Sequence, residues 1–415
     1  MVLVALAAGV VLAAGSARRV GSAGRPARPV SRRGGLRARS VAFAGLALTA
    51  AVVLTALGAW RLGSTDEPGL GGHVSAAGAP ATPTIAPRPA RPIATPTPSP
   101  TAPAPVWRLL AVGDVLMDRS EAAGFDPFAG LVPSLATAEL AAVNVEMAIA
   151  TGGRPEEKAF VFRASPSAAR TIAAAGVDIG NLGNNHALDF GIDALYQTMA
   201  SLRSAGVAPV GAGANESEAY APESFEIGGV RVAVIGASRV LPTVRWAARA
   251  GPGLASAYYE DRLVEAVRSA TASHDVVIVM VHWGIEGAPC PSRDQERLGA
   301  ALLQAGASVV LGSHPHVLQP IALRDGGLIA YSLGNFVWHP RSGPAGETGV
   351  LEVRFEGSRV SGYQLYPHVL DGRGAPVPAG PAAAWRIQAA VQRPCLSMVG
   401  TSGGWARSGR ALLLD

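Results

Sequence analysis

The residues of this chain that are best suited to chemistry follow short apolar runs, each at the point where a buried strand should end. The run LLAVGD ends on Asp114, AAVNVE ends on Glu146, and VVIVMVHWG carries His282. In α/β sheets, ligands bind beyond the carboxyl ends of the strands, so we expect these side chains at one edge. The candidate groups at this edge are Asp114, Glu146, Asn185, His186, His282, His314 and His316, and Asn335 follows a further apolar run.

The chemical types of these residues indicate a metal site. Carboxylates, an amide and imidazoles supply oxygen and nitrogen ligands, which suit Mn, Zn, Fe or Mg. We expect one or two divalent ions, because a pair can activate water and hold both oxygens of a displacement. The chain has two cysteines and no CxxC motif, which excludes a cysteine-based zinc site. Nearby glycines, such as Gly113 and Gly334, are expected to allow the tight turns that aim these side chains.

Each of these residues also has an ordinary structural interpretation when it is considered alone. An aspartate after a strand is more often a helix cap or a turn residue, and a buried histidine is usually a hydrogen-bonded core residue. His314 and His316 are more informative, because alternate residues of an extended segment point to the same face and could share an ion. The placement of all the candidates after strands favours the metal site.

The elements that must position these side chains alternate between strands and helices. Ser292 and Gln295 fit a capping box at the start of one of the helices. Strands that alternate with helices predict an α/β domain with a largely buried sheet. The predicted strands are 109–112, 141–145, 230–235, 276–281, 308–311 and 328–331, and the predicted helices are 166–175, 192–205, 260–273 and 293–305.

The N-terminal quarter of the chain has a different composition. Residues 1–40 are arginine-rich with a possible first apolar segment, and residues 41–60 form an uncharged run long enough to cross a bilayer. Because arginines that flank a span stay cytoplasmic, we expect a single-pass anchor in the cell membrane, with a cleaved signal peptide as the alternative. Residues 61–106 are rich in Pro and Thr and predict a disordered linker. The expected extracytoplasmic domain is 107–370, and 371–415 is expected to pack on it.

The overall charge of +5 does not describe the predicted domain. Residues 107–415 hold 24 Lys+Arg against 28 Asp+Glu, a net charge of −4. A nucleic-acid binder carries its basic patch on the folded domain, so we expect no nucleic-acid partner. Lys158 is the only lysine of the chain, which we attribute to genomic composition bias. Cys290 and Cys395 could form one disulfide outside the cytosol or remain free thiols, and the sequence leaves both possibilities open.

Six segments of the predicted domain carry a recognisable pattern: GDVLMDR (113–119), NVEMAI (144–149), NLGNNHALDFG (181–191), VHWGIE (281–286), GSHPHVLQPI (312–321) and YSLGNF (331–336). Taken together and in this order, they resemble the CapA family of poly-γ-glutamate capsule biosynthesis proteins, over roughly residues 107–340. That family is similar to the calcineurin-like metallophosphoesterases. The resemblance therefore implies a four-layer α/β/β/α sandwich with a two-metal site.

The resemblance also implies a role for each matching residue. Glu146 stands where the phosphoesterases use a bridging aspartate, and His186 matches their catalytic histidine. Leu116 stands where they place the histidine of a D-x-H motif, so one ion loses a ligand, and one tight ion with one loose ion would fit. The other implied metal ligands are Asp114, Asn185, His282, His314 and His316.

We expect a metal-dependent hydrolase or transferase of capsule or poly-γ-glutamate biosynthesis that acts on an anionic cell-surface polymer. His186 would donate a proton to the leaving group, and Asp189 would either orient His186 or cap the next helix. Glu286 could act as a second acid, and arginines could hold polymer carboxylates. The predicted substrate-binding residues are Arg119, Arg163, Glu286 and Asn335.

Two other functions remain open. One is a metal-dependent phosphoesterase acting on a nucleotide or lipid phosphate, against which the missing first-motif histidine counts. The other is a non-catalytic subunit of a polymer export complex, which the anchor and the linker suit equally well. Other membrane subunits of a polymer synthesis or export complex are expected partners.

Overall fold

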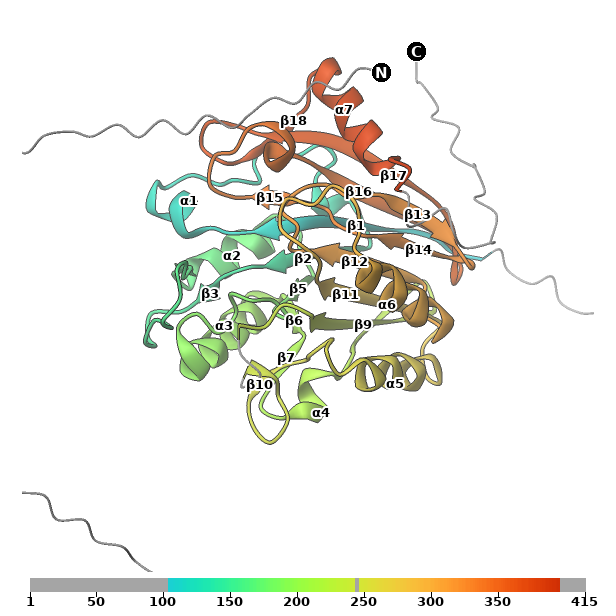
Figure 1. The fold of residues 1–415 in the computed structure, drawn as a ribbon, viewed down its shortest axis with the longest axis horizontal. Coiled ribbons are helices and arrows are strands. Elements are labelled where there is room, and N and C mark those ends of the chain that lie inside the picture. The colour runs from blue at the N-terminus through green and yellow to red at the C-terminus, as the bar shows by residue number, and fades with distance from the viewer. Residues whose placement is uncertain (1–103, 243–245, 396–415) are drawn as a thin grey trace, which may run out of the picture. The chain divides into compact units, whose positions relative to one another are not determined.

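The computed structural model describes residues 104–242 and 246–395. These residues form a mixed α/β fold in which two β-sheets are covered by helices (Figure 1). The predicted segments 1–40 and 41–60, nearly all of the linker 61–106, and residues 396–415 lie outside the described residues. Within the described residues, no helix combines the length and the apolar character that a membrane span requires.

The first sheet has eight strands and carries half of the expected ligands. In spatial order the strands are β18 (Pro376–Pro378), β17 (Arg359–Leu370), β16 (Glu347–Glu356), β1 (Val106–Val115), β2 (Leu140–Val145), β5 (Ile179–Asn181) and β6 (Ala208–Val210), and β15 (Asn335–Val337) also pairs with β1, in parallel. The central strands β1, β2, β5 and β6 run parallel, and β16, β17 and β18 add to β1 in antiparallel order.

The second sheet has six strands, of which the inner four are parallel and the two at the edges antiparallel. In spatial order they are β13 (Ile321–Arg324), β14 (Gly327–Ala330), β12 (Val309–Ser313), β11 (Val276–His282), β9 (Val230–Ser238) and β8 (Glu223–Ile227). Two small ladders join β3 (Ala148–Ile149) to β4 (Arg163–Ala164) and β7 (Ala212–Gly213) to β10 (Gly253–Leu254).

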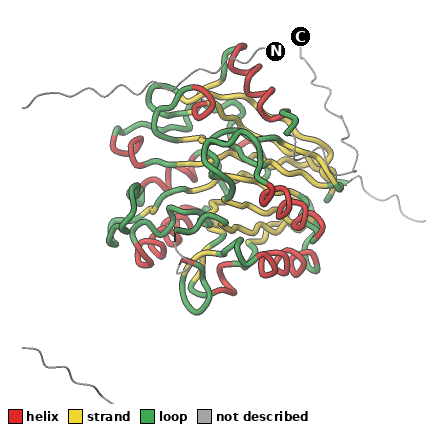
Figure 2. The backbone as a smooth tube through the Cα atoms, in the orientation of Figure 1, coloured by secondary structure: helices red, strands yellow, loops and turns green. Residues whose placement is uncertain are grey.

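Helices flank the two sheets, and Figure 2 shows the strands between them. On one side lie α2 (Ser167–Ala174) and α3 (Gly191–Ala205), and on the other α5 (Glu260–Thr271) and α6 (Arg293–Gln304) (Figure 1). Further helices among the described residues are α1 (Asp118–Ala122), α4 (Glu216–Ala219), α7 (Pro381–Val391) and the 3₁₀ turns Leu135–Thr137 and Gly343–Gly346.

The alternation of side chains along β1 explains the layers. Successive residues of a strand point to opposite faces. Leu109 belongs to the same core as Val232 of β9, between the sheets, whereas Leu110 belongs to the core that includes Ile172 of α2, on the outer face. A third core joins the outer face of the second sheet to α5 and α6 through residues such as Leu298. The layers are therefore helix, sheet, sheet and helix, as the resemblance implied.

The predicted elements are present among the described residues with shifted ends. The helix predicted at 293–305 is α6, and Ser292 and Gln295 form its capping box. The patterns missed the hairpin of β16 and β17, whose turn contains Gly357 in a left-handed conformation. Cys290 and Cys395 form a disulfide, so the first of their two alternatives holds. This disulfide links the segment before α6 to the chain after α7. Helix α7 packs on β16 and β17.

Candidate metal centre

Five parallel strands, three from the first sheet and two from the second, bring the six predicted ligands together at their carboxyl ends. The ligand atoms form two groups, and within each group they lie no more than 4.8 Å apart. Asn185 joins them, because its Oδ1 is 2.7 Å from His282 Nε2. The first group is Glu146, His282 and His314, and the second is Asp114, Glu146 and His316. The two groups share the carboxylate of Glu146.

Asp114 lies inside β1, and the backbone beside it makes an unusually close contact. The Asp114 N–H donates to the carbonyl of Gly334 at 2.9 Å. A Cβ added to Gly113 would lie 1.9 Å from that carbonyl oxygen, so only glycine fits there. Gly113 is therefore required because the Gly334 carbonyl approaches β1 closely, and the expectation that Gly113 allows a tight turn was wrong. Gly334 does occupy a turn, with a left-handed φ of 67°.

His282 is the last residue of β11, and its neighbours determine which ring nitrogen faces the other ligands. Its Nδ1 lies 2.9 Å from Ser313 Oγ and 3.2 Å from Asn144 Nδ2. Its Nε2 is left facing Asn185 and Glu146, with Glu146 Oε1 at 3.5 Å. Partners of this kind orient a histidine ligand and fix its tautomer.

His314 and His316 lie in a turn, so the expectation of an extended segment was wrong. β12 ends at Ser313, and the two histidines have φ values of 96° and 56°. Such left-handed backbone costs a non-glycine residue about 1–3 kcal/mol and persists where surrounding contacts hold it. Asn335 Nδ2 donates to the His316 carbonyl at 3.2 Å. The turn directs His314 toward His282 and His316 toward Asp114, whose Oδ2 is 3.0 Å from His316 Nδ1.

Burial sets the protonation of the cluster. Burial, reinforced by the charge of Asp114, raises the pKa of Glu146 well above its usual value. Burial also lowers the pKa of His282 well below its usual value and lowers the pKa of His314 to about 4. Although burial opposes it, the hydrogen bond and charge of Asp114 raise the pKa of His316. His282 and His314 are therefore neutral at pH 7, the form in which imidazole binds metal ions.

The donor set fits divalent cations. Glu146 Oε1 is buried without a hydrogen-bond partner and lies 3.5 Å and 3.7 Å from Nε2 of His282 and His316. Ligand atoms on a tetrahedral ion with bonds near 2.1 Å lie about 3.4 Å apart. Asp114 is also fully buried, and no arginine or lysine of the described chain forms an ion pair with either carboxylate. Two neighbouring buried carboxylates repel each other when both are ionised, and divalent cations would supply the counter-charge.

A network of buried amides, which the sequence analysis missed, holds the two carboxylates. Asn144 Nδ2 donates to Asp114 Oδ1 at 2.9 Å and to Glu146 Oε2 at 3.3 Å. Its Oδ1 accepts from the amides of Asn181 and Asn184 at 3.0 Å and 3.3 Å. The available signal was an asparagine inside an apolar strand, where a buried polar group needs partners.

His186 lies beside the cluster and is held by a buried carboxylate. Its Nδ1 is 2.7 Å from Oδ2 of Asp189, which is fully buried. No side chain caps α3, so Asp189 contacts His186 and does not cap the helix. Burial lowers the pKa of His186, and the hydrogen bond that its ring donates to Asp189 partly opposes this shift. Because Nδ1 is bonded to Asp189, Nε2 is the ring nitrogen left for another partner.

Lys158, which we had attributed to composition bias, completes this arrangement. Its Nζ forms an ion pair with Asp189 Oδ1 at 2.5 Å and donates to the Asn185 carbonyl at 2.6 Å. The ammonium group also lies 5.2 Å from the centre of the Trp246 ring. A single lysine in a chain that otherwise uses arginine was the signal that could have identified it.

Two of the predicted substrate-binding residues contact the cluster. Glu286 is exposed, and its carboxylate forms a third group with His314 and His316, again within 4.8 Å. Asn335 is buried and supports the His316 turn, as described above. Arg119 and Arg163 are exposed and contact no cluster residue in the described structure. The guanidinium of Arg163 lies 4.3 Å from the ring centre of Phe190.

Aromatic side chains line the cluster on the side of His186. The Phe162 ring centre is 4.4 Å from that of His186, and Trp338 is 4.7 Å from His316. Phe162 and Trp338 meet edge to face at 5.8 Å. Beside these rings, His186 is buried and His316 is partly exposed.

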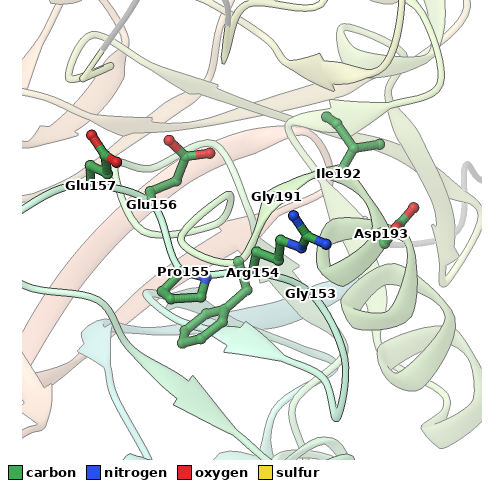
Figure 3. Close-up of a pocket in the computed structure, with 9 residues that line it drawn as sticks. Gly153, Arg154, Pro155, Glu156, Glu157, Gly191, Ile192 and Asp193 are labelled. Carbon is green, nitrogen blue, oxygen red and sulfur yellow. The ribbon is translucent and has the colours of Figure 1, made fainter. Parts of the chain in front are cut away.

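A surface pocket of about 700 Å³ adjoins the segments that carry Lys158 and Asp189 (Figure 3). It contains none of the cluster ligands, and its charged lining has both signs, with Arg154, Glu156, Glu157 and Asp193. The predicted chemistry therefore lies beside this pocket and not within it.

Comparison with known proteins supports the interpretation of these motifs. The family model described as "Bacterial capsule synthesis protein PGA_cap" matches residues 108–340. PGA biosynthesis protein CapA of Bacillus subtilis (strain 168) is 30% identical over 236 residues, covering 55% of this chain and 62% of the relative. Capsule biosynthesis protein CapA of Bacillus anthracis is 34% identical over 186 residues, covering 44% and 45%. The chain thus spans less than two thirds of the length of these relatives.

Two solved structures are distantly similar to this chain. A hypothetical protein from Thermus thermophilus is 21% identical, with a TM-score of 0.42, and the match covers 63% of this chain and 98% of that one. A putative 5′-nucleotidase from Staphylococcus aureus is 15% identical, with a TM-score of 0.40, and the match covers 69% and 58%. No functional conclusion rests on similarities this weak.

Proposed function

The chain belongs to the bacterial capsule synthesis protein family PGA_cap, and from this premise we propose that it is a metal-dependent hydrolase or transferase acting on an anionic cell-surface polymer. One observation carries the proposal: two groups of ligands share Glu146, and the His186–Asp189 pair lies beside them. The polymer class comes from the relatives, whose names refer to PGA and capsule biosynthesis.

The proposed setting is the outer face of the cell membrane, with residues 41–60 as the anchor and other membrane subunits as partners. The disulfide between Cys290 and Cys395 supports this setting, because structural disulfides persist in oxidising compartments. The mildly acidic domain, with a net charge of −4 over residues 107–415, gives no support to a nucleic-acid partner.

In the proposed mechanism, the divalent ions would be held by Asp114, Glu146, Asn185, His282, His314 and His316. Such ions would supply Lewis acidity to an acyl or phosphoryl centre and activate the attacking group. His186 exchanges a proton with the leaving group through Nε2, because Asp189 occupies Nδ1. Lys158 fixes the position of Asp189 and of the Asn185 backbone at the same time.

The contacts of Asp189 also restrict the orientation of the His186 ring. The carboxylate of Asp189 accepts from the Phe162 N–H at 2.6 Å as well as from His186, so the imidazole ring cannot swing freely. A fixed ring keeps Nε2 in one orientation, which is what proton transfer within hydrogen-bond distance requires. The Phe162 ring packs against the same histidine, with the two ring planes tilted by 32°.

The proposal is tested with the purified full-length chain, freed of metal and then supplied with Mn²⁺, Zn²⁺ or Mg²⁺ in turn. Poly-γ-glutamate and a generic phosphodiester serve as parallel substrates, and polymer length and phosphate-ester cleavage are measured. We expect metal-dependent change in the polymer that His282→Ala and His186→Ala abolish. His274→Ala is the matched control, because His274 contacts Ser224 at the surface and no cluster residue.

The alternatives give different results in the same experiment. Turnover of the phosphodiester alone, lost in His186→Ala, would replace the polymer enzyme with a phosphoesterase. A chain that binds no metal by elemental analysis would leave only the non-catalytic subunit of an export complex.

A further inference from the structure

A second histidine near the metal cluster is held by a carboxylate. Nε2 of His339 lies 3.0 Å and 3.1 Å from the two carboxylate oxygens of Asp118. Asp189 holds His186 in the same manner, but through Nδ1. The side chains of His339 and Asp118 are 15% and 22% exposed, so solutes can reach the pair. Neither residue belongs to the groups of metal ligands.

The fold explains why His339 and its carboxylate partner meet beside the cluster. Strands β1 and β15 pair in parallel, with Val115 opposite Val337, so the segments that follow them leave the sheet at the same end. The cluster lies at this end of β1. A Cβ added to Gly374 would lie 1.7 Å from the Trp338 carbonyl oxygen. His339 is therefore presented by a closely packed segment.

The ring of Phe162 contacts both of these histidines. Its centre lies 4.4 Å from that of His186, with the planes tilted by 32°. It lies 5.8 Å from that of His339, which it meets edge to face at 89°. The two histidine rings are thus separated by the sum of these distances at most, about 10 Å, the length of about three residues of an extended peptide. One chain-like substrate can contact both rings.

The contact with Asp118 determines what the other ring nitrogen of His339 can bind. A carboxylate only accepts hydrogen bonds, so Nε2 carries the proton. In the neutral ring Nδ1 is then an acceptor, and it has no hydrogen-bond partner among the described residues. A phosphodiester and a carboxylate offer no donor to such an atom. Each unit of an amide-linked polymer offers one, its N–H.

We propose that His339 is a substrate-binding residue whose Nδ1 accepts a hydrogen bond from an amide N–H of the polymer, next to the position that His186 serves. Asp118 positions the ring. The inference rests on the proposed function and narrows its substrate class to anionic polymers joined by amide bonds.

The test measures binding to the full-length, Mn²⁺-loaded chain by fluorescence anisotropy, at low temperature to limit turnover. The labelled probes are a short γ-linked oligoglutamate and an oligoacrylate of matched length, which has carboxylates but no amide. His339→Gln keeps a donor at the place of Nε2, and so the contact with Asp118, but has no atom at the place of Nδ1. His339→Asn has the opposite pattern, with an amide oxygen near the place of Nδ1. His274→Gln is the matched control, because His274 contacts Ser224 at the surface.

We expect His339→Gln to bind the oligoglutamate about three- to tenfold more weakly than His274→Gln, which is the effect of one hydrogen bond. Both variants should bind the oligoacrylate equally well, whereas a structural role of His339 would weaken both probes alike. His339→Asn should bind the oligoglutamate more tightly than His339→Gln, although it loses the contact with Asp118.

Three results would overturn the inference and leave an enzyme of an anionic polymer intact. They are equal oligoglutamate affinities in His339→Gln and His274→Gln, an equal loss of affinity for the oligoacrylate, and weaker binding in His339→Asn than in His339→Gln. A wild-type chain that binds no oligoglutamate would overturn both the inference and the proposed polymer substrate.

Discussion

Lys158 offers the sharpest test of how the region around His186 is built, through the change Lys158→Met. Methionine keeps an unbranched side chain of similar length and removes the ammonium group. The change breaks the ion pair with Asp189 and the hydrogen bond to the Asn185 carbonyl. It leaves a fully buried carboxylate that still accepts from Phe162 and His186.

The loss of stability expected for Lys158→Met follows from the burial of its ion pair with Asp189. Removing one partner of a buried ion pair costs about 3–5 kcal/mol. The side chain of Lys158 is 19% exposed and Asp189 keeps two donors, which argues for the lower end, about 3 kcal/mol. For the roughly 290 described residues, an unfolding entropy of about 2.1 cal/mol/K per residue converts this loss into a Tm lower by about 5 °C.

The assay is thermal unfolding of the metal-free chain, followed by circular dichroism. Arg170→Met is the matched control, because it removes an exposed cation from α2 and should change the Tm by less than about 1 °C. The charge of Lys158 also lowers the pKa of His186, after the larger effect of burial. That pKa, measured by NMR, should therefore rise in Lys158→Met. A Tm equal to that of Arg170→Met would refute the reasoning.

Three further predictions concern the cluster and its support. Asn144→Leu removes the donor to both carboxylates and should weaken Mn²⁺ binding by about 10–100-fold in a metal titration, whereas unchanged affinity would show that the amide network is dispensable. Cys395→Ser opens a cross-link between residues 105 apart and should lower the free energy of unfolding in urea by up to about 4.7 kcal/mol, and a reductant should then have no further effect. His314 has a pKa near 4 when folded and about 6.5 when unfolded, so from pH 6.5 down to 4 the unfolded chain binds the extra proton. The metal-free protein should lose up to about 3 kcal/mol over this range relative to His314→Gln, and parallel pH profiles of the two proteins would contradict the assignment.

The ligands could be predicted from the sequence because strand ends and ligand types are both local signals. Asp114, Glu146 and His282 each follow an apolar run, and the edge of a parallel sheet collects whatever follows its strands. Burial on both faces made these strands recognisable as continuous apolar runs. The joint placement of the ligands therefore needed no knowledge of long-range contacts.

The supporting residues could not be predicted in the same way. Lys158 lies in an irregular segment 31 residues before Asp189, and only the fold brings their charges together. The spacing of His314 and His316 did not predict their turn. Alternate side chains point to one face only while the chain stays extended, and β12 ends at Ser313, one residue before His314. The disulfide was undecided for a similar reason, since it joins residues 105 apart.

The central claim is that one cluster at the strand ends holds two divalent ions that share Glu146. Anomalous X-ray diffraction from crystals of the Mn²⁺-loaded chain tests it most directly. We predict two manganese peaks about 3.5–4 Å apart, one beside Asp114 and His316 and the other beside His282 and His314. A map with no peak within bonding distance of Glu146 would contradict the claim.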